Sequence, residues 1–326
     1  MQNNLPLISI VIPVFNRADL IQECINSCIN QTYENIEIIV LDNCSDDTTF
    51  ERAVELSNIY ENILVYRQKI NIGPVLNWLD VIKKANGEFV KILFSDDILY
   101  PNFIEETYSK FEPNIGFVLS SFDMGEEITK TVIQNDWPKI NGAIDSNIYI
   151  ESAIRKFAFC VSPGAALFRT KDVIDVFETE IPSPTLNNFK SHGAGPDLLI
   201  FLKIASKYSK IFKIESSLTF FRFHKNSQTI KMNKSKGGLI KSCYMQARVY
   251  FSETYDKKMF GNSLGKALFV ELFQNKKIKA LNINFLINSY TLNQRFSYID
   301  IMIGFINAIY DAIAEVFRRI NLFTRK

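Results

Sequence analysis

Short apolar runs alternate with amphipathic segments through the first half of the chain. The apolar runs are rich in β-branched residues and have the length of single strands: Ile8 to Phe15, Ile36 to Leu41, Ile63 to Arg67 and Phe89 to Phe94. The segments between them carry apolar residues at helical spacing: Ala18 to Gln31, Thr48 to Tyr60 and Val75 to Asn86. This alternation predicts an α/β fold with a mostly parallel sheet and helices on both of its faces.

The alternation becomes less regular after Gly116. Strand-like runs at Gly116 to Asp123 and Gly164 to Arg169 lie on either side of a helical pattern from Ile150 to Phe159. The segment Ile181 to Gly195 is rich in Pro, Asn and Gly, which is typical of a loop, and a predicted helix follows it from Pro196 to Tyr208. We therefore expect this half to build the second side of a site, with a mobile loop over it.

Three further helical patterns close the sequence, at Gly237 to Tyr255, Gly261 to Lys279 and Phe296 to Ile320. They predict a C-terminal helical extension of residues 236–326. The preceding residues 1–235 are predicted to form the main domain, with halves at 1–115 and 116–235.

The last predicted helix has an apolar side and a basic end. Its apolar side comprises Met302, Phe305, Ile306, Ile309, Ile313, Val316, Phe317 and Ile320, and its basic residues are Arg318, Arg319, Arg325 and Lys326. Two interpretations remain open. The helix lies on a membrane surface, held by apolar burial and attraction to anionic lipids, or it packs in a protein core or an oligomer interface.

Composition excludes several classes of protein. With 47% hydrophobic and 22% charged residues among 326, the chain is expected to fold rather than to be disordered. A net charge of +2 provides little electrostatic attraction to a nucleic-acid backbone, so no nucleic-acid partner is expected. The apolar stretch from Tyr298 to Phe317 contains three carboxylates, and the N-terminus lacks the pattern of a signal peptide, so no spanning helix or leader is expected.

The five cysteines are scattered, without the spacing of a zinc site or of a disulfide scaffold, which favours a reducing cytoplasm. Cys24 and Cys28 belong to the apolar stripe of one predicted helix and are expected to pack against the sheet. Trp78 is also expected to fill core.

Acidic residues gather where predicted elements end. Asp42 follows one strand, Asp96 and Asp97 follow another, and Asp197 follows the Gly- and Pro-rich loop. The carboxyl ends of parallel strands form the crevice in which open sheets bind ligands. A divalent cation shared with a diphosphate would neutralise these carboxylates, so the sequence predicts a nucleotide bound with Mn²⁺ or Mg²⁺.

Four motifs occur in order along this half: Pro13-Val14-Phe15-Asn16-Arg17, the run Leu41 to Thr48, Asn71-Ile72-Gly73, and Phe94-Ser95-Asp96-Asp97. Together they resemble the ordered signature of family 2 glycosyltransferases with the GT-A fold. The resemblance implies a Rossmann-like domain that binds a nucleotide-diphosphate sugar. The donor-binding residues that it implies are Pro13, Val14, Phe15, Asn16, Arg17, Asp42, Asn71, Gly73 and Asp96, with Asp42 on the base ring and Asp96 on the ribose; Asp97 is implied as a metal ligand.

Two shorter motifs extend the resemblance, Gly195-Pro196-Asp197-Leu198-Leu199 and the run Phe221 to Ser227. By similarity, Asp197 is the general base on the acceptor hydroxyl. Pro196 stands where the family usually has Glu, and proline suits the first turn of a helix. His224 is implied to approach the metal or the diphosphate, and Arg222 is a further candidate.

These residues imply an inverting transfer of a sugar to a hydroxyl group, because no nucleophile for a retaining double displacement stands out. The resemblance implies a growing, lipid-linked polysaccharide of the O-antigen or capsule type as acceptor, at the inner face of the cell membrane. An inactive nucleotide-sugar-binding module is the alternative. A nucleotidyltransferase is a distant third, because the loop after the first strand, Asn16 to Asp19, lacks glycines that would hold a triphosphate.

Overall fold

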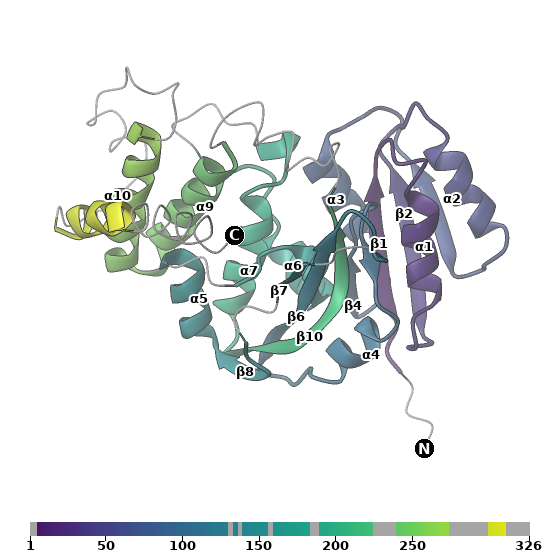
Figure 1. Cartoon of the computed structure of the whole chain (residues 1–326), viewed down its shortest axis with the longest axis horizontal. Coiled ribbons are helices and arrows are strands. Elements are labelled where there is room, and N and C mark those ends of the chain that lie inside the picture. The colour runs from purple at the N-terminus through teal and green to yellow at the C-terminus, as the bar shows by residue number, and fades with distance from the viewer. Residues whose placement is uncertain are drawn as a thin grey trace, which may run out of the picture. The chain divides into compact units, whose positions relative to one another are not determined.

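The computed structural model describes residues 5–129, 133–135, 139–155, 159–182, 189–223, 239–273 and 299–310 (Figure 1). The chain forms two compact units. The first comprises Met1–Thr179 and Lys190–Lys225, and the second comprises Glu180–Phe189 and Asn226–Lys326. The predicted domain boundary between residues 235 and 236 lies outside the described residues.

The first half of the first unit has the predicted alternation. Its strands are β1 (Ile8–Val14), β2 (Ile36–Asp42), β3 (Ile63–Arg67) and β4 (Phe89–Ile92), and its helices are α1 (Ile21–Ile29), α2 (Thr49–Ser57) and α3 (Pro74–Ile82). The four strands are parallel, in the order β3-β2-β1-β4. Every residue of β1 and β2 is buried, as expected for central strands covered on both faces.

The second half adds strands of both directions. They are β5 (Ile98–Leu99), β6 (Ile115–Gly125), β7 (Ile133–Asn135), β8 (Gly142–Asp145), β9 (Ala166–Arg169) and β10 (Lys210–Arg222). The sheet continues from β4 in the order β9-β6-β10-β5, with β7 on β6 and β8 on β10. β9 is antiparallel to β4 and β6, whereas β6 and β10 are parallel.

The α/β fold class is confirmed, but the sheet is more mixed than predicted. Four of the described strand pairings are parallel and five are antiparallel. All five of these antiparallel pairs involve β5, β7, β8 or β9, which have two to four residues each. Runs this short carry too little periodicity to show a strand or its direction.

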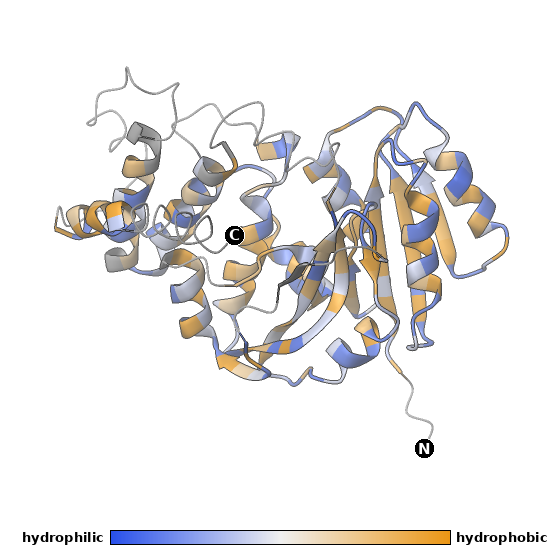
Figure 2. Cartoon of the chain, in the orientation of Figure 1, coloured by the Kyte–Doolittle hydropathy of each residue, from blue (hydrophilic) through white to orange (hydrophobic). Residues whose placement is uncertain are grey.

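Helices cover both faces of the sheet. Side chains of β1 (Ile8, Ile10, Ile12) pack with α1, α2 and α4 (Phe103–Tyr108) in one core. Leu93 belongs to that core, and the next residue, Phe94, contacts Trp78 of α3, so α3 lies on the opposite face. Apolar residues accordingly concentrate in the central strands (Figure 2).

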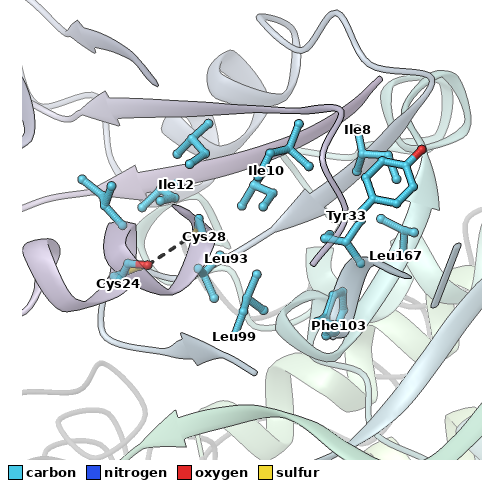
Figure 3. Close-up of a cluster of buried hydrophobic side chains, with 14 of the residues drawn as sticks. Ile8, Ile10, Ile12, Cys24, Cys28, Tyr33, Leu93, Leu99, Phe103 and Leu167 are labelled. Atoms are coloured by element: carbon cyan, nitrogen blue, oxygen red, sulfur yellow. Dashed lines mark hydrogen bonds between the residues drawn. The ribbon is translucent and has the colours of Figure 1, made fainter. Parts of the chain in front are cut away.

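Cys24 and Cys28 of α1 are buried in this core beside Leu93 and Leu99, which confirms their predicted packing role (Figure 3). The Cys28 thiol donates to the Cys24 carbonyl at 3.5 Å. Burial raises the pKa of Cys28 to about 12, so its thiolate is not available for reaction or for metal binding.

The remaining described helices of the first unit are α5 (Ser146–Arg155), α6 (Thr170–Val176) and α7 (Pro196–Ala205), with the short 3-10 turn η1 (Pro163–Ala165). A second 3-10 turn, η2 (Phe189–Ser191), lies where the two units meet in sequence. Pro196 occupies the first turn of α7, as predicted, where its missing N–H needs no partner.

The described helices of the second unit are α9 (Leu239–Tyr255), α10 (Lys257–Phe273) and a helix over residues 299–310. This last helix crosses α10 at small residues: a Cβ on Gly265 would lie 2.0 Å from the Ile301 carbonyl oxygen, and one on Gly304 would lie 2.1 Å from that of Asn262. Phe305, predicted on the apolar side, packs against α10 instead of facing outward. The predicted residues from 311 onward lie outside the described residues.

The outward side of this helix is apolar. Its exposed large hydrophobic residues are Ile299, Met302, Ile303, Ile306, Ile309 and Tyr310. Among the helices that the structure describes, none has the length and apolar character needed to cross a bilayer.

Candidate active site

The loops after β1 and β2 are joined by hydrogen bonds at the carboxyl edge of the sheet. The Asn16 N–H donates to Ser45 Oγ at 2.9 Å, and Asn16 Oδ1 accepts from the Asp46 N–H at 3.1 Å. The Arg17 N–H donates to Thr49 Oγ1 at 2.8 Å. Pro13 and Val14 end β1 beneath this junction, and Phe15 is 40% exposed at its rim.

Asp42 ends β2 with no exposed surface. Its carboxylate accepts from the Ser45 N–H at 3.0 Å and from Ser45 Oγ, and it lies 3.3 Å from Nε of Arg67. Arg67 also donates to the Ser45 carbonyl at 2.6 Å. Asp42 therefore holds the turn through Ser45, and contact with a base ring requires this enclosure to open.

The Asn71 to Gly73 loop joins the same edge through Asn43. Asn43 Nδ2 donates to Asn71 Oδ1 at 3.0 Å, and Asn43 Oδ1 accepts from the Ile72 N–H at 3.0 Å. Gly73 has φ of 85°, a left-handed conformation that favours glycine, and α3 begins at the next residue. Three of the four predicted donor motifs thus meet at one edge.

The fourth motif forms a turn after β4. The Asp97 N–H donates to the Phe94 carbonyl at 3.0 Å, and the Asp97 side chain is buried with Oδ1 accepting from the Arg222 N–H at 3.0 Å. Asp96 is partly exposed, and one of its carboxylate oxygens lies 3.9 Å from Arg17 Nη2. This contact brings the Asp96 turn to the loop after β1.

Arg222, at the end of β10, fixes this turn. Its Nε donates to the Asp96 carbonyl at 3.1 Å, Nη1 donates to the Glu126 carbonyl at 3.1 Å, and Nη2 donates to the Glu23 carboxylate at 2.6 Å. The predicted site residue Arg222 is therefore placed at the site, where its guanidinium group binds protein oxygens. His224 lies outside the described residues.

Burial shifts the pKa of Asp97 and of the nearby Lys91. The pKa of Asp97 is raised well above its ordinary value, first by burial and then by the neighbouring Asp96 carboxylate, while the Arg222 N–H and Lys91 oppose the shift. Lys91 lies fully buried in β4, donates to the Gly164 carbonyl, and has its Nζ 4.0 Å from the centre of the Phe103 ring. Burial lowers its pKa to about 7.

Sequence analysis did not select Lys91. A signal was present, because a lysine inside the apolar run Phe89 to Phe94 is unusual in a strand buried on both faces.

Asp197 lies in the first turn of α7. Its Oδ1 accepts from the Gly195 N–H at 2.8 Å and from the Leu198 N–H at 2.7 Å, and its N–H donates to the Gly193 carbonyl at 3.3 Å. Gly193 and Gly195 have φ of 74° and 110°, which other residues rarely adopt. These bonds give the Asp197 carboxylate a defined orientation at the helix N-terminus.

Comparison with known proteins decides the family. Residues 9–177 match the family model described as glycosyl transferase family 2. This chain belongs to glycosyl transferase family 2. The match spans β1 to α6 and includes the four donor-side motifs, so the predicted resemblance is confirmed.

Curated relatives match over about a third of this chain or less. An uncharacterized glycosyltransferase of Haemophilus influenzae is 36% identical over 112 residues, covering 34% of this chain and 34% of the relative. One of Rickettsia felis is 45% identical over 102 residues, covering 31% of this chain and 16% of the relative. A poly(ribitol-phosphate) beta-glucosyltransferase of Bacillus spizizenii is 42% identical over 95 residues, covering 28% and 15%.

The match to this chain therefore spans about a third or less of the length of these relatives. Among solved structures, the crystal structure of Staphylococcus aureus TarS residues 1–349 in complex with UDP-GlcNAc has a similar fold, with a TM-score of 0.58 and 16% sequence identity. The similarity covers 86% of this chain and 79% of that chain. It confirms the predicted GT-A fold of this chain.

The described residues of this chain bring no three His, Cys, Asp or Glu side chains together as a metal-binding group. Asp96 and Asp97 nevertheless provide two adjacent carboxylates, and carboxylate oxygens are preferred ligands of Mg²⁺ and Mn²⁺. Mg²⁺ commonly binds one or two carboxylates and completes its shell with substrate phosphates and water. The pair fits a metal of this kind.

Proposed function

We propose that this family 2 glycosyltransferase is an inverting enzyme that transfers a sugar from a nucleoside diphosphate to a hydroxyl group of a growing, lipid-linked polysaccharide of the O-antigen or capsule type. The observation that carries the proposal is the junction of the loops after β1, β2 and β3 with the Asp96 turn. It lies at the carboxyl ends of parallel strands, where open sheets bind nucleotides.

In this proposal the donor binds along that junction. Pro13, Val14, Phe15, Asn16 and Arg17 line one side, and Asn71 and Gly73 line the other. Asp42 accepts the imide N–H of the base after the Ser45 turn opens, and Asp96 contacts the ribose. The crystallised TarS complexes with UDP and UDP-GlcNAc support a uridine nucleotide as the first donor to test.

Asp97 and Asp96 would hold a divalent cation, with His224 as a further proposed ligand and Arg222 fixing the pair. A bound Mn²⁺ or Mg²⁺ stabilises the negative charge that develops on the leaving diphosphate. Arg222 holds the turn rigid, because its side chain donates three hydrogen bonds, to Asp96, Glu126 and Glu23.

Asp197 acts as the general base. Its carboxylate accepts the proton of the acceptor hydroxyl while that oxygen forms a bond to the anomeric carbon, and the bond from this carbon to the donor phosphate breaks. The nucleoside diphosphate leaves from the opposite face, so the configuration inverts. The hydrogen bonds from Gly195 and Leu198 to Oδ1 orient the carboxylate for this step.

We place the reaction at the cytoplasmic face of a membrane. The exposed apolar side of helix 299–310, followed in the sequence by Arg318, Arg319, Arg325 and Lys326, has the composition of a helix that binds an anionic lipid surface. A relative named for glucosylation of poly(ribitol-phosphate) supports a surface polymer as acceptor.

An inactive donor-binding module is the second candidate, and Pro196 in place of the usual Glu is the observation that favours it. One experiment separates the two. Release of nucleoside diphosphate is measured from UDP-, GDP- and dTDP-sugars, with and without Mn²⁺, with a membrane lipid extract as acceptor source. Metal-dependent release from one donor class supports the transferase. Tight donor binding without release supports the module, and no binding to any donor contradicts both.

A further inference from the structure

The loop that carries Asp197 rests on a tryptophan of α3. The six-membered ring of Trp78 lies directly against Gly193, since a Cβ on that glycine would fall 2.1 Å from Cη2 and 2.6 Å from Cζ3. One turn earlier on the chain, Gly73 meets the same loop, and a Cβ there would lie 3.2 Å from the Lys190 carbonyl oxygen. The start and the middle of α3 therefore both face the segment 190–195.

The same ring contacts the strand end that carries the acidic pair. The centroids of Trp78 and Phe94 are 5.0 Å apart, and Phe94 is followed by Ser95, Asp96 and Asp97. Trp78 thus contacts both the segment that leads to Asp197, the proposed base, and the segment that leads to Asp96 and Asp97.

Helix α3 is a firm base for this ring. Asn77 Nδ2 donates to the Leu41 carbonyl at 3.0 Å, next to Asp42, and Asp80 accepts from Gln68 Nε2 at 2.9 Å. A short path leads from the ring to the proposed base: Trp78 touches Gly193, whose carbonyl accepts the Asp197 N–H. A shift of Gly193 therefore moves Asp197.

We propose that Trp78 is a positioning residue that sets the place of Asp197 relative to Asp96 and Asp97. The inference rests on the proposed role of Asp197 as general base. Arg222 holds Asp96 and Asp97 through hydrogen bonds that do not involve Trp78. Loss of the ring is therefore expected to disturb the placement of the base and to leave the donor side in place.

The test uses two variants and a matched control. Trp78→Ala removes the ring, and Gly193→Ala places a methyl group against the intact ring at a left-handed backbone position. Tyr66→Ala is the control, because Tyr66 is a partly exposed aromatic residue of β3 whose ring contacts Lys84. Asp197→Asn reports on the proposed base itself.

The first readout does not depend on activity. Hydrogen exchange at the amides of residues 193–199 is expected to become at least about tenfold faster in Trp78→Ala and Gly193→Ala, and to stay unchanged in Tyr66→Ala. Exchange at residues 95–97, which Arg222 holds without Trp78, is expected to change less than about threefold in all three variants. Wild-type exchange rates at residues 193–199 in both Trp78→Ala and Gly193→Ala would overturn the inference.

The second readout is UDP release from UDP-GlcNAc with a membrane lipid extract. In Trp78→Ala and in Gly193→Ala, kcat is expected to fall at least about tenfold while the donor KM changes less than about threefold. The double variant is expected to be no slower than the slower single variant, because both changes act on one contact. If Asp197→Asn is inactive but Trp78→Ala keeps the wild-type kcat, the role of Trp78 is contradicted and the proposed base is not. If Asp197→Asn keeps the wild-type kcat, the role of Asp197 as general base is contradicted.

Discussion

Two non-glycine residues of the donor-side loops, Asn16 and Cys44, have left-handed backbone conformations with φ of 51° and 62°. Such conformations cost about 1–2 kcal/mol for most residues, and Asn adopts them more readily because its short side chain bonds to nearby backbone. Asn16 does so with the Asp46 N–H. Asn16 therefore has two roles: its backbone adopts the left-handed conformation of the turn, and its side chain joins the two loops.

Substitution of Asn16 separates these two roles. Asn16→Gly loses the hydrogen bond to Asp46 and keeps the conformation, whereas Asn16→Ala loses the bond and also strains the backbone. We expect the alanine variant to be less stable than the glycine variant by about 1 kcal/mol, measured by urea unfolding. Equal stability of the two variants would show that the left-handed backbone at Asn16 carries no cost.

Lys91 predicts a pH dependence of stability. Its pKa is lowered to about 7 in the folded protein by burial and returns to the ordinary lysine value on unfolding. Between these two values the unfolded chain binds a proton that the folded protein does not, so this group adds stability as pH rises from 7 toward 10, by about 1.4 kcal/mol per pH unit. Below pH 7 both states bind the proton, so this pH dependence levels off and the cost of burying the charged amine is fully present.

Lys91→Met removes this contribution. The free energy of unfolding of the wild type minus that of the variant is expected to increase between pH 7 and pH 9, by up to about 3 kcal/mol. The comparison is made by urea unfolding at both pH values. A difference that stays constant over this range would contradict the lowered pKa of Lys91.

At the scale of elements, the end of β10 holds the turn after β4. Arg222 presents its guanidinium group to oxygens of Asp96, Glu126 and Glu23, and its N–H to Asp97. Lysine carries the same charge but cannot reproduce this forked set of donors. We expect Arg222→Lys to weaken Mn²⁺-dependent donor binding about tenfold, measured by calorimetry with UDP-GlcNAc.

The matched control for this element is Glu23→Gln. Glu23 is half-exposed, so its ion pair with Arg222 contributes little, and the expected change in donor affinity is less than about threefold. Equal losses in the two variants would assign the effect to the surface ion pair instead of the held turn.

The long elements could be predicted from the sequence, and the short ones could not. β1 and β2 have seven residues each, and most of these are apolar or β-branched. β5 and β7 have two and three residues and pair only because β10 and β6 lie beside them. Their pairing is decided by tertiary context, which local pattern does not contain.

The same limit applies to the site. Motifs at strand ends pointed to Asp42, Asp96 and Asp97 because topology gathers such ends at one edge. Other features of the site depend on contacts between residues far apart in sequence. These features are the enclosure of Asp42 by Arg67, the burial of Lys91 and the contact of Trp78 with Gly193. Trp78 could be read only as an aromatic core residue until its neighbours were known.

At the scale of the whole molecule, the apolar outward side of helix 299–310 predicts membrane binding. We expect the protein to sediment with vesicles of anionic phospholipid and less with neutral vesicles, because apolar burial and charge attraction act together. Replacing Met302 and Ile306, which are 59% and 44% exposed, by Gln is expected to reduce this binding at least about fivefold.

Asn307→Gln, on the exposed side of the same helix, is the control and is expected to bind as the wild type does. Unchanged vesicle binding in the double variant would assign the apolar side to a protein interface.

Catalysis by the whole molecule depends on one carboxylate in the proposed mechanism. The most direct measurement compares wild type and Asp197→Asn for nucleoside diphosphate release in the presence of acceptor, with donor affinity measured in parallel. We expect kcat to fall about 10²- to 10⁴-fold while donor affinity stays within about twofold, because the amide keeps the shape of the side chain and cannot accept the hydroxyl proton. Release at the wild-type rate by Asp197→Asn would contradict the proposed mechanism.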